Sequence, residues 1–243
     1  MQDVCLLCEK YREHKTECTT NQDCAVCKEA EMHKRRAEFA REECQNMADG
    51  RDLPPNTSVF AADMQKVVLL PKLETKEHFF VSRLVVFNET CASVRGSPDY
   101  TVLWHEAVAG GQASNVASSY IRCLKECNAK HVIFWADNCS AQNKNWTLYT
   151  ALCWCVHQSW GPESITLAYL EKGHTTMRAD SIHGNIAVSM KKQRCIWDFN
   201  SFVELCTNAA KNIQPLLMKP HDFYKFVGGQ RAKVKILHFT TVK

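Results

Sequence analysis

The sequence predicts an α/β protein: a mixed sheet with flanking helices, plus a small zinc-binding and helical segment at the N-terminus. Between residues 57 and 198, short apolar runs alternate with stretches of helical periodicity. One run, 132–136, is apolar without a break and is followed directly by Asp137, a residue disfavoured inside strands. Near the N-terminus, two closely spaced pairs of cysteines stand in a polar segment. The alternation of apolar runs and helical stretches predicts the sheet with its helices. The acid directly after residues 132–136 predicts a ligand site at the end of that strand, and the cysteine pairs predict a metal site.

The composition describes a globular chain with no membrane-spanning segment. Of the 243 residues, 45% are hydrophobic and 23% are charged, which is typical of folded domains and not of disordered ones. The net charge of +4 permits a nucleic-acid partner without requiring one. No apolar run approaches the roughly 18–20 residues that cross a bilayer, and the first residues lack the pattern of a secretion signal. We therefore expect an intracellular protein whose 14 cysteines are thiols and metal ligands and not disulfides.

The cysteines between residues 5 and 27 predict a structural zinc site. Two CxxC pairs lie fifteen residues apart, and each pair places two thiolates on one side of a tight turn. We expect one Zn²⁺ bound by these four cysteines, which are Cys5, Cys8, Cys24 and Cys27. His33 is the first alternative ligand, and His14 and Cys18 are further candidates. Free thiols are the alternative, but this segment has few apolar residues with which to fold without a metal.

A charged helix follows the cysteines. Residues 29–47 are rich in Ala, Glu, Lys and Arg, which favour helices. Four basic side chains of this helix and one later lysine are candidates for contacts with nucleic-acid phosphates: Lys34, Arg35, Arg36, Arg41 and Lys144. The alternative for the helix is a solvated face without a ligand. Glycine and proline at 48–57 predict a linker, so residues 1–50 form the zinc-knuckle and helical segment.

The rest of the chain divides into a catalytic domain at 57–198 and a C-terminal helical and tail extension at 199–243. In the domain we expect strands at 58–70, 79–88 and 100–108, the first two joined by a connection of hairpin length at 71–77. A helix at 112–127, a strand at 131–137, a helix at 146–160, a strand at 164–170 and a helix at about 177–194 follow. The extension contains a helix at 199–212, a linker at 215–220 and a tail rich in aromatic and lysine residues.

This order of elements is that of an RNase H-like sheet, in which an antiparallel meander is followed by crossovers that add parallel strands beside the first. The first and fourth strands are then neighbours, so Asp63 faces Asp137 at the end of the fourth strand. Asp180, near the start of the helix after the last strand, closes a cluster of three carboxylates. Such a cluster suits two Mg²⁺ or Mn²⁺ ions, which together cleave phosphodiesters. A strand-to-helix turn capped by Asp137 or Asn138 is the alternative.

Polar residues around these acids are expected to support the site: Glu106, Asn138, Gln142, Asn143, His174 and His183. His183 lies three residues after Asp180 and shares its helix face. Glu106 either supports the metal from a distance or belongs to a surface pair, and His174 either positions water or phosphate or anchors its loop. Cys139 has no histidine placed by sequence to activate it, so we expect it to pack and not to act as a nucleophile.

Four motifs occur in order along the domain: Ala-Asp-Met-Gln at 62–65 with a proline at 71, Trp-His-Glu at 104–106, the segment 136–145, and Gly-His-Thr at 173–175 with the acid at 180. In this order, and at similar spacing, they resemble transposase-like proteins of animal and oomycete genomes, which are largely uncharacterised and thought to derive from mobile elements. The resemblance implies an RNase H-like fold and a three-acid, cut-and-paste mechanism with Asp63, Asp137 and Asp180 as the acids.

The N-terminus and the central motif are partly similar to the same group. Cys5 and Cys8 together with His33 resemble its N-terminal pattern, whereas the second CxxC pair departs from it. Ala141 stands where that group usually has glycine.

From the acids and the resemblance we expect metal-dependent cleavage and strand transfer of DNA at the ends of a mobile element, in the nucleus. A homo-oligomer is compatible with this and is left open. Two alternatives remain: a catalytically silent, domesticated relic that binds DNA or protein, and an RNase H-like nuclease that acts on RNA or single strands. Divalent-metal-dependent nicking of duplex DNA separates the first interpretation from the relic, and a preference for hybrid or single-stranded substrates separates it from the nuclease.

Overall fold

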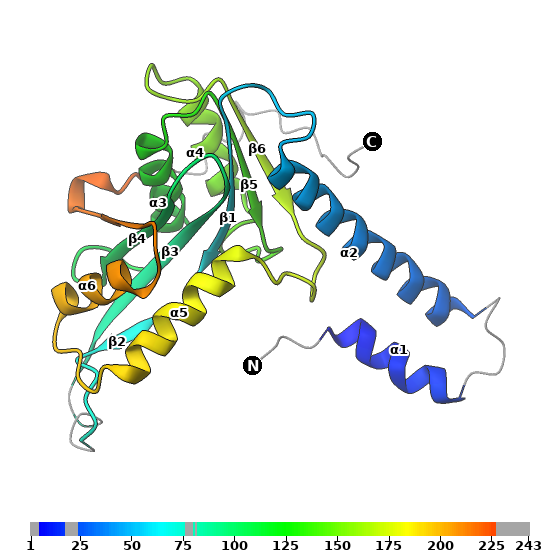
Figure 1. Ribbon diagram of the computed structural model, residues 1–243, viewed down its shortest axis with the longest axis horizontal. Coiled ribbons are helices and arrows are strands. Elements are labelled where there is room, and N and C mark those ends of the chain that lie inside the picture. Colours follow the sequence, from blue (N-terminus) through cyan, green and yellow to red (C-terminus); the bar gives the residue numbers. More distant parts are fainter. Residues whose placement is uncertain (1–4, 18–23, 76–79, 81, 227–243) are drawn as a thin grey trace.

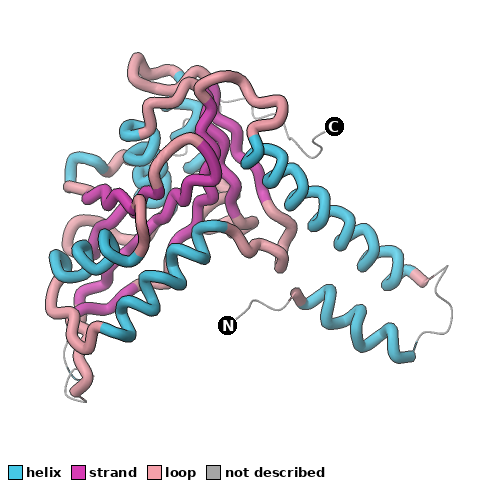
Figure 2. The backbone as a smooth tube through the Cα atoms, in the orientation of Figure 1, coloured by secondary structure: helices cyan, strands magenta, loops and turns pink. Residues whose placement is uncertain are grey.

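The protein is described by a computed structural model that covers residues 5–17, 24–75, 80 and 82–226. Within these residues a seven-stranded mixed sheet lies between helices (Figure 1 and Figure 2). Its strands are β1 (Thr57–Met64), β2 (Val68–Leu70), β3 (Leu84–Arg95), β4 (Asp99–His105), β5 (His131–Ala136), β6 (Ser164–Tyr169) and β7 (Ile213–Leu217). The helices are α1 (Leu6–Glu17), α2 (Ala25–Asp49), α3 (Ala113–Glu126), α4 (Trp146–Val156), α5 (Arg178–Lys192), α6 (Phe199–Ala209) and the short 3₁₀ helix η2 (Pro220–Asp222).

The strands follow the order β6-β5-β1-β3-β4-β7 across the sheet, and β2 pairs with β3. β5 lies parallel to β1, in register from Thr57 opposite His131 to Ala62 opposite Ala136. On its other side β1 pairs antiparallel with β3, which pairs antiparallel with β4. This confirms the predicted placement of the strand at 131–137 beside the first strand, with the meander on the opposite side. The order is compatible with an RNase H-like sheet.

Alternating side chains on β1 explain why helices cover both faces of the sheet. Phe60 and Ala62 belong to a core cluster shared with α3 and α4, whereas Ala61 belongs to a second cluster shared with α5 and α6. Successive residues of a strand point to opposite faces, so an apolar strand such as β1 needs cover on both. The apolar stripe predicted for 112–127 is buried in the first cluster: Val116, Tyr120, Cys123, Leu124 and Cys127.

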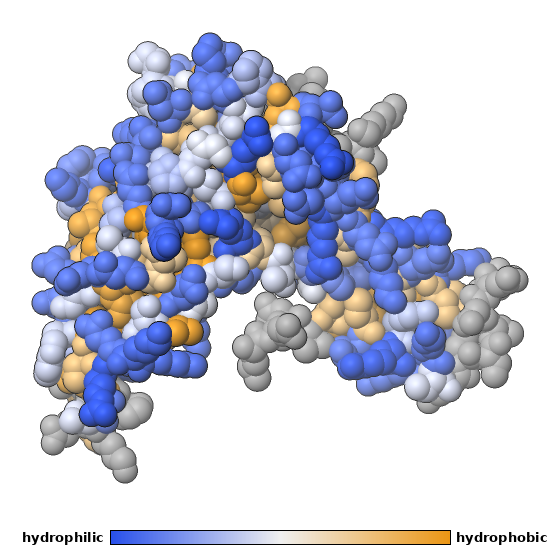
Figure 3. All heavy atoms as spheres, viewed as in Figure 1, coloured by the Kyte–Doolittle hydropathy of each residue, from blue (hydrophilic) through white to orange (hydrophobic). Residues whose placement is uncertain are grey.

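A third cluster seats the C-terminal half of α2 against the sheet. Ile133 and Trp135 of β5 pack with Ala40, Cys44 and Met47 of the helix. The rest of α2 extends beyond the sheet, and α1 lies beside that extension (Figure 1). Hydrophilic side chains cover most of the outer face of α2 in Figure 3. None of the helices within the described ranges is long and apolar enough to cross a bilayer.

α1 is a helix where the cysteine spacing predicts a tight turn. Its residues include Leu, Glu, Lys and Arg, which are good helix formers. Cys5 directly precedes the helix and Cys8 lies in its first turn, so a spacing of three places both on the same side. A CxxC spacing alone therefore does not distinguish a zinc knuckle from the first turn of a helix.

Two strand predictions need correction. The expected strand at 58–70 is interrupted at 65–67, where Lys66 and Val67 are exposed, and it divides into β1 and β2, both paired with β3. The next strand begins at Leu84 and runs to Arg95. Phe80, which extended the apolar pattern backwards in the sequence, is 91% exposed, and residue 79 lies outside the described residues.

The linker predicted at 215–220 is wrong for its first part. Residues 213–217 form β7, which pairs in parallel with β4 and so brings part of the expected C-terminal extension into the main sheet. Pro215 concealed this strand in the sequence, because proline lacks a main-chain donor and is tolerated mainly on edge strands such as this one. The predicted tail at 227–243 lies outside the described residues.

Candidate functional site

Side chains converge on one point near the carboxyl end of β1. Ligand atoms of Asp63, Asp180 and His183 all lie within 4.8 Å of one another. The Oδ2 atom of Asp63 is 3.7 Å from Nδ1 of His183. Asp180 and His183 lie three residues apart on α5, so they share one face of the helix. The structure thus brings two of the three predicted aspartates together with a predicted supporting histidine.

Asp137 directly follows β5, the strand beside β1, and lies outside this group. Because Ala62 is in register with Ala136, Asp63 and Asp137 are the next residues along two adjacent parallel strands. The Oδ1 atom of Asp137 accepts hydrogen bonds from the main-chain N–H of Cys139 at 3.0 Å and from Nδ2 of Asn143 at 2.7 Å. The loop after β5 therefore closes around this carboxylate, and the three aspartates form no single compact group within the described residues.

Asn143 is the centre of that loop. It is 1% exposed, and its Oδ1 accepts a hydrogen bond from the hydroxyl of Tyr120 at 2.9 Å. The hydroxyl of Tyr169 donates to the carbonyl of Asn143 at 2.7 Å. With its Nδ2 donated to Asp137, this predicted supporting residue fixes the position of the acid.

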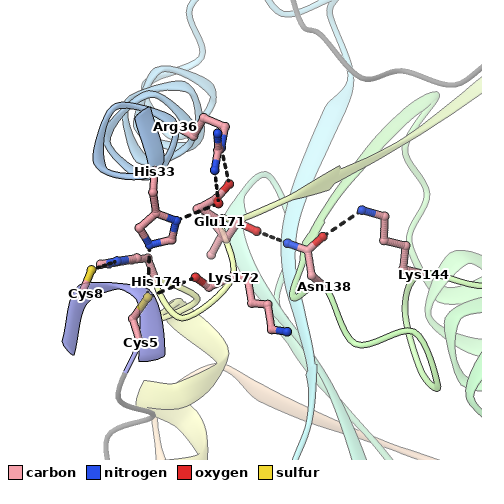
Figure 4. A network of polar contacts seen from close by, with 10 residues as sticks. Cys5, Cys8, His33, Arg36, Asn138, Lys144, Glu171, Lys172 and His174 are labelled. Atoms are coloured by element: carbon pink, nitrogen blue, oxygen red, sulfur yellow. Dashed lines mark hydrogen bonds and ion pairs between the residues drawn. The ribbon is translucent and has the colours of Figure 1, made fainter. Parts of the chain in front are cut away.

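Asn138, Gln142 and Lys144 hold the same loop in other ways. Nδ2 of Asn138 donates to the carbonyl of Leu170, and its Oδ1 accepts from Nζ of Lys144 at 3.1 Å (Figure 4). The main-chain N–H of Gln142 donates to the carbonyl of Cys139 at 3.2 Å. Lys144, predicted to contact phosphates, is thus engaged within the protein.

Glu89 is the buried acid that the sequence prediction missed. It lies within β3, opposite Met64 of β1, and is 0% exposed. Neither carboxylate oxygen has a hydrogen-bond partner among the described residues. Burial raises the pKa of Glu89 well above its usual range, and the charges of Cys91, Asp63 and Asp137 raise it further. Glu89 therefore lies within the electrostatic reach of both aspartates. An acid in the middle of an apolar strand is the signal that could have identified it.

The donor atoms of this site fit a hard divalent cation. Carboxylate oxygens are the preferred ligands of Mg²⁺ and Mn²⁺, and Asp63 and Asp180 are the residues that would hold such an ion. Burial lowers the pKa of His183 to about 4, so its ring is neutral near pH 7 and adds no competing positive charge. The unpartnered oxygens of Glu89 agree with this interpretation, because a buried carboxylate is favoured only with a proton or a cation nearby.

Glu106, predicted either to support the metal or to form a surface pair, binds the main chain instead. Its Oε1 accepts a hydrogen bond from the main-chain N–H of Val85 at 2.9 Å, and its own N–H donates to the carbonyl of Val85 at 2.9 Å. Glu106 is exposed and extends the pairing of β3 with β4. It lies outside the acid group.

A second group, of cysteine and histidine side chains, lies where α1 and α2 meet the loop between β6 and α5 (Figure 4). Ligand atoms of Cys5, Cys8, His33 and His174 all lie within 4.8 Å of one another. Sγ of Cys5 is 3.2 Å from Nε2 of His33, and Sγ of Cys8 is 3.3 Å from Nε2 of His174. Of the two roles considered for His174, this arrangement favours the anchoring of its loop.

Glu171 orients one of these histidines. Its Oε1 accepts a hydrogen bond from Nδ1 of His33 at 2.9 Å, and Arg36 donates to the same oxygen at 3.2 Å (Figure 4). Burial alone would raise the pKa of Glu171, but the hydrogen bonds from Arg36 and His33 outweigh it and lower the pKa below its usual value. With Nδ1 bonded to the carboxylate, Nε2 of His33 faces the sulfur of Cys5. Arg36, predicted to contact phosphate, is therefore an ion-pair partner here.

The four cysteines predicted to share one zinc ion fall into two groups: Cys5 and Cys8 with His33, and Cys24 and Cys27 with His14. The helix α1, with 12 residues, is about 18 Å long and lies between them, which explains why the two CxxC pairs do not meet. In the second group, Sγ of Cys24 is 3.0 Å from Nε2 of His14. The main-chain hydrogen bond from Cys27 is the main cause that lowers the pKa of Cys24 to about 7. Cys18 lies outside the described residues.

A cavity of about 1060 Å³ lies between the two helices of the N-terminal segment and the end of β5. Residues 137–140 form one wall, and the loop residues 171–173 and 175 form another. The third wall is made by α1 and α2 and includes Lys10 and Arg36. The cavity therefore joins the loop that holds Asp137 to the cysteine and histidine group.

The other predicted phosphate contacts on α2 are mostly occupied within the protein. Arg35 forms an ion pair with Glu31 one turn earlier, and Nζ of Lys34 lies 5.0 Å from the ring centroid of Tyr11. Arg41 is exposed. These contacts fit the solvated-face alternative for much of this helix.

Comparisons of this chain with protein-family models, with curated proteins and with solved structures found no match.

Proposed function

We propose that this chain is a metal-dependent nuclease of the polynucleotidyl transferase type, derived from a transposase and RNase H-like in fold, which cleaves and joins DNA strands. The observation that carries the proposal is the convergence of Asp63, Asp180 and His183 near the carboxyl end of β1, next to the strand that leads into Asp137. Open sheets place their ligands at the carboxyl ends of parallel strands. The four motifs that resemble transposase-like proteins support the same proposal.

The residues of the site have distinct tasks in this proposal. Mg²⁺ or Mn²⁺ ions, when bound, activate the attacking hydroxyl group and stabilise the leaving oxygen of a phosphodiester. Asp63, Asp180 and Asp137 would hold the ions, and Asn143 keeps Asp137 in place directly after β5. Glu89 retains a proton in the absence of a cation, because its site is buried and two acids lie nearby.

A polynucleotide is the substrate class that fits the surroundings. The cavity beside Asp137 includes Lys10 and Arg36, whose positive charges attract phosphates, although Arg36 is also paired with Glu171. Nuclear localisation and the ends of a mobile element as the target belong to the same proposal.

A catalytically silent relic that binds DNA or protein is the second candidate. The observation that favours it is the state of Asp137, whose Oδ1 already accepts two hydrogen bonds and which stands outside the acid group. A carboxylate that keeps these bonds permanently would leave the second ion without a ligand.

Nicking of supercoiled plasmid in Mn²⁺ tests the proposal. We expect activity in the wild type and a loss of several orders of magnitude in Asp63→Asn and Asp137→Asn, with a somewhat smaller loss in Asp180→Asn. Asp52→Asn is the matched control, because Asp52 is exposed and its φ of 54° is readily adopted by asparagine.

The outcomes separate the candidates. A wild type that shows neither nicking nor a rise in melting temperature with Mn²⁺ favours the relic. Nicking that survives both Asp63→Asn and Asp137→Asn rejects the carboxylate mechanism. Faster cleavage of RNA–DNA hybrids than of duplex DNA assigns the chain to RNase H-like nucleases instead.

A further inference from the structure

We propose that Cys5, Cys8, His33 and His174 bind one zinc ion, and that this ion fastens the N-terminal helices to the loop that leads into α5. This site lies outside the acid group, and the inference does not depend on the proposed nuclease activity. It also differs from a zinc knuckle formed within the N-terminal segment, because one ligand, His174, comes from the loop between β6 and α5.

The distances between the ligand atoms fit four-coordinate zinc. Zinc–sulfur bonds of about 2.3 Å and zinc–nitrogen bonds of about 2.0–2.1 Å imply sulfur–nitrogen separations of roughly 3.5 Å in a tetrahedron. The separations from Cys5 to His33 and from Cys8 to His174 are 3.2 Å and 3.3 Å. The ring centroids of the two histidines are 4.9 Å apart, so both Nε2 atoms face the same small space.

The surroundings of His33 are those of a metal ligand. Histidines that bind zinc usually donate their other ring N–H to a carboxylate, which fixes the tautomer and leaves the second nitrogen free for the metal. Glu171 receives that hydrogen bond here at 2.9 Å and is itself held by Arg36. His33 is 4% exposed, so this orientation is maintained inside the protein.

α1 has few apolar contacts that could hold it in place without a metal ion. None of the described residues of α1 is buried, and Leu6 at its start is 69% exposed. Apolar packing therefore contributes little to holding this helix in place, whereas a metal ion supplies binding energy that does not need a core.

Gly173 permits the close approach that the site requires. A Cβ atom at this position would lie 2.7 Å from Cβ of Cys5 and 2.9 Å from its Sγ. The φ angle of Gly173 is +77°, a conformation that other residues rarely adopt. The backbone before His174 thus lies directly against the first cysteine, as a ligand set shared between two distant segments demands.

The consequence is a link between the N-terminal helices and the edge of the sheet. The residues 171–175 belong to the loop between β6 and α5, and α5 begins with the turn that carries Asp180. The same loop lines the cavity that Asp137 and Lys10 also border. Zinc at this site would set the position of the N-terminal helices over that cavity.

Zinc content and cobalt spectroscopy of the whole chain test the inference. We expect His174→Ala and Cys5→Ser each to lose one equivalent of zinc relative to the wild type, as measured by elemental analysis. Cobalt in the wild type should give sulfur-to-cobalt charge-transfer bands and the strong visible bands of a four-coordinate ion, and both variants should lose them. His174→Cys should restore one equivalent and change the cobalt spectrum, because it supplies a third thiolate.

Two controls decide between ligand loss and general damage. His221→Ala and Cys153→Ser alter exposed side chains outside the group and should keep the full zinc content. His174→Ala with unchanged zinc and an unchanged cobalt spectrum would overturn the inference. In that case, the double variant Cys5→Ser/Cys24→Ser would be compared with Cys5→Ser alone. Equal zinc loss in the two would indicate that one ion is shared by the cysteines of both CxxC pairs.

Discussion

Nε2 of His174 lies 3.3 Å from Sγ of Cys8, although the two residues stand 166 positions apart in the chain. The contact joins the start of α1 to the loop that leads into α5. The same loop supplies Glu171, which orients His33, and Gly173, against which Cys5 packs. This loop therefore contacts both N-terminal helices, in addition to the apolar packing of α2 on β5.

Replacing Gly173 by alanine is expected to weaken the zinc site. The added Cβ would collide with Cys5, and the left-handed backbone costs a residue other than glycine roughly 1–2 kcal/mol. We expect zinc to be lost at lower chelator concentration than in the wild type. We also expect faster proteolysis within α1, because the helix would no longer be held on the loop.

Gly184→Ala is the matched control for this substitution. Nothing lies within 4 Å of a Cβ at Gly184, which is inside α5. Alanine there should leave zinc affinity unchanged and stabilise the helix by about 0.5–1 kcal/mol. Equal zinc retention by the two variants would contradict the close contact between Gly173 and Cys5.

Substituting Glu171→Gln is expected to lower zinc affinity by about 10–100-fold, because the carboxylate that accepts the hydrogen bond from Nδ1 of His33 and orients its ring is removed. Competition with a chromophoric chelator measures the change. Glu163→Gln is the control: Glu163 pairs with Lys130 at 2.8 Å on the surface, away from the group, and should have no effect. Unchanged affinity in Glu171→Gln would mean that His33 is held in place without its carboxylate partner.

The order of the central elements could be predicted because their signals are local. Residues 132–136 are buried in the sheet as their unbroken apolar pattern indicates, and the stripe on α3 faces the core. β7 could not be predicted in the same way, because Pro215 interrupts its pattern and its pairing with β4 depends on the whole sheet. The break between β1 and β2 likewise depends on where β3 runs.

The candidate sites show the same division between local and tertiary information. The spacing of Cys5 and Cys8 predicts them as candidate ligands, but nothing in that spacing indicates that His174 and not Cys24 lies beside them. Asp63 and Asp137 could be placed on neighbouring strands from the order of elements. Glu89 carries a local signal, as an acid within an apolar strand, but its burial without hydrogen-bond partners among the described residues and its closeness to Asp63 and Asp137 depend on the packed structure.

Replacing Tyr120 by phenylalanine is expected to destabilise the loop that holds Asp137. The hydroxyl of Tyr120 donates to Oδ1 of Asn143 at 2.9 Å inside the core, and its removal leaves that oxygen without this donor. A buried polar group left unpaired costs about 1–3 kcal/mol. The melting temperature should fall by roughly 2–4 °C for each kcal/mol of stability that is lost. Tyr224→Phe, which removes a surface contact with Lys125, should change stability by less than about 0.5 kcal/mol.

Glu89→Gln is expected to stabilise the metal-free protein in a way that depends on pH. The pKa of Glu89 is raised in the folded state above the usual 4.5, so the folded protein keeps this proton after the unfolded chain has lost it. Between these two pKa values the folded state binds more protons, and stability therefore falls as the pH rises. Glutamine cannot ionise, so the variant does not lose this stability as the pH rises. The variant should match the wild type below about pH 4 and become progressively more stable toward neutral pH.

Divalent cations should lower the pKa of Glu89, the reverse of the effect of burial and of the neighbouring acids. A cation near Asp63 and Asp137 offsets their charge and favours the ionised form of Glu89, so Mn²⁺ should raise the melting temperature of the wild type more than that of Glu89→Gln at pH 7. Glu204→Gln, at an exposed position on α6, is the control for both measurements and should resemble the wild type throughout. If Glu89→Gln raises stability by the same amount at pH 4 and pH 7, folding does not raise the pKa of Glu89. An undiminished response to Mn²⁺ would place the cation away from this acid, and Asp63 and Asp180 would then bind it without Glu89.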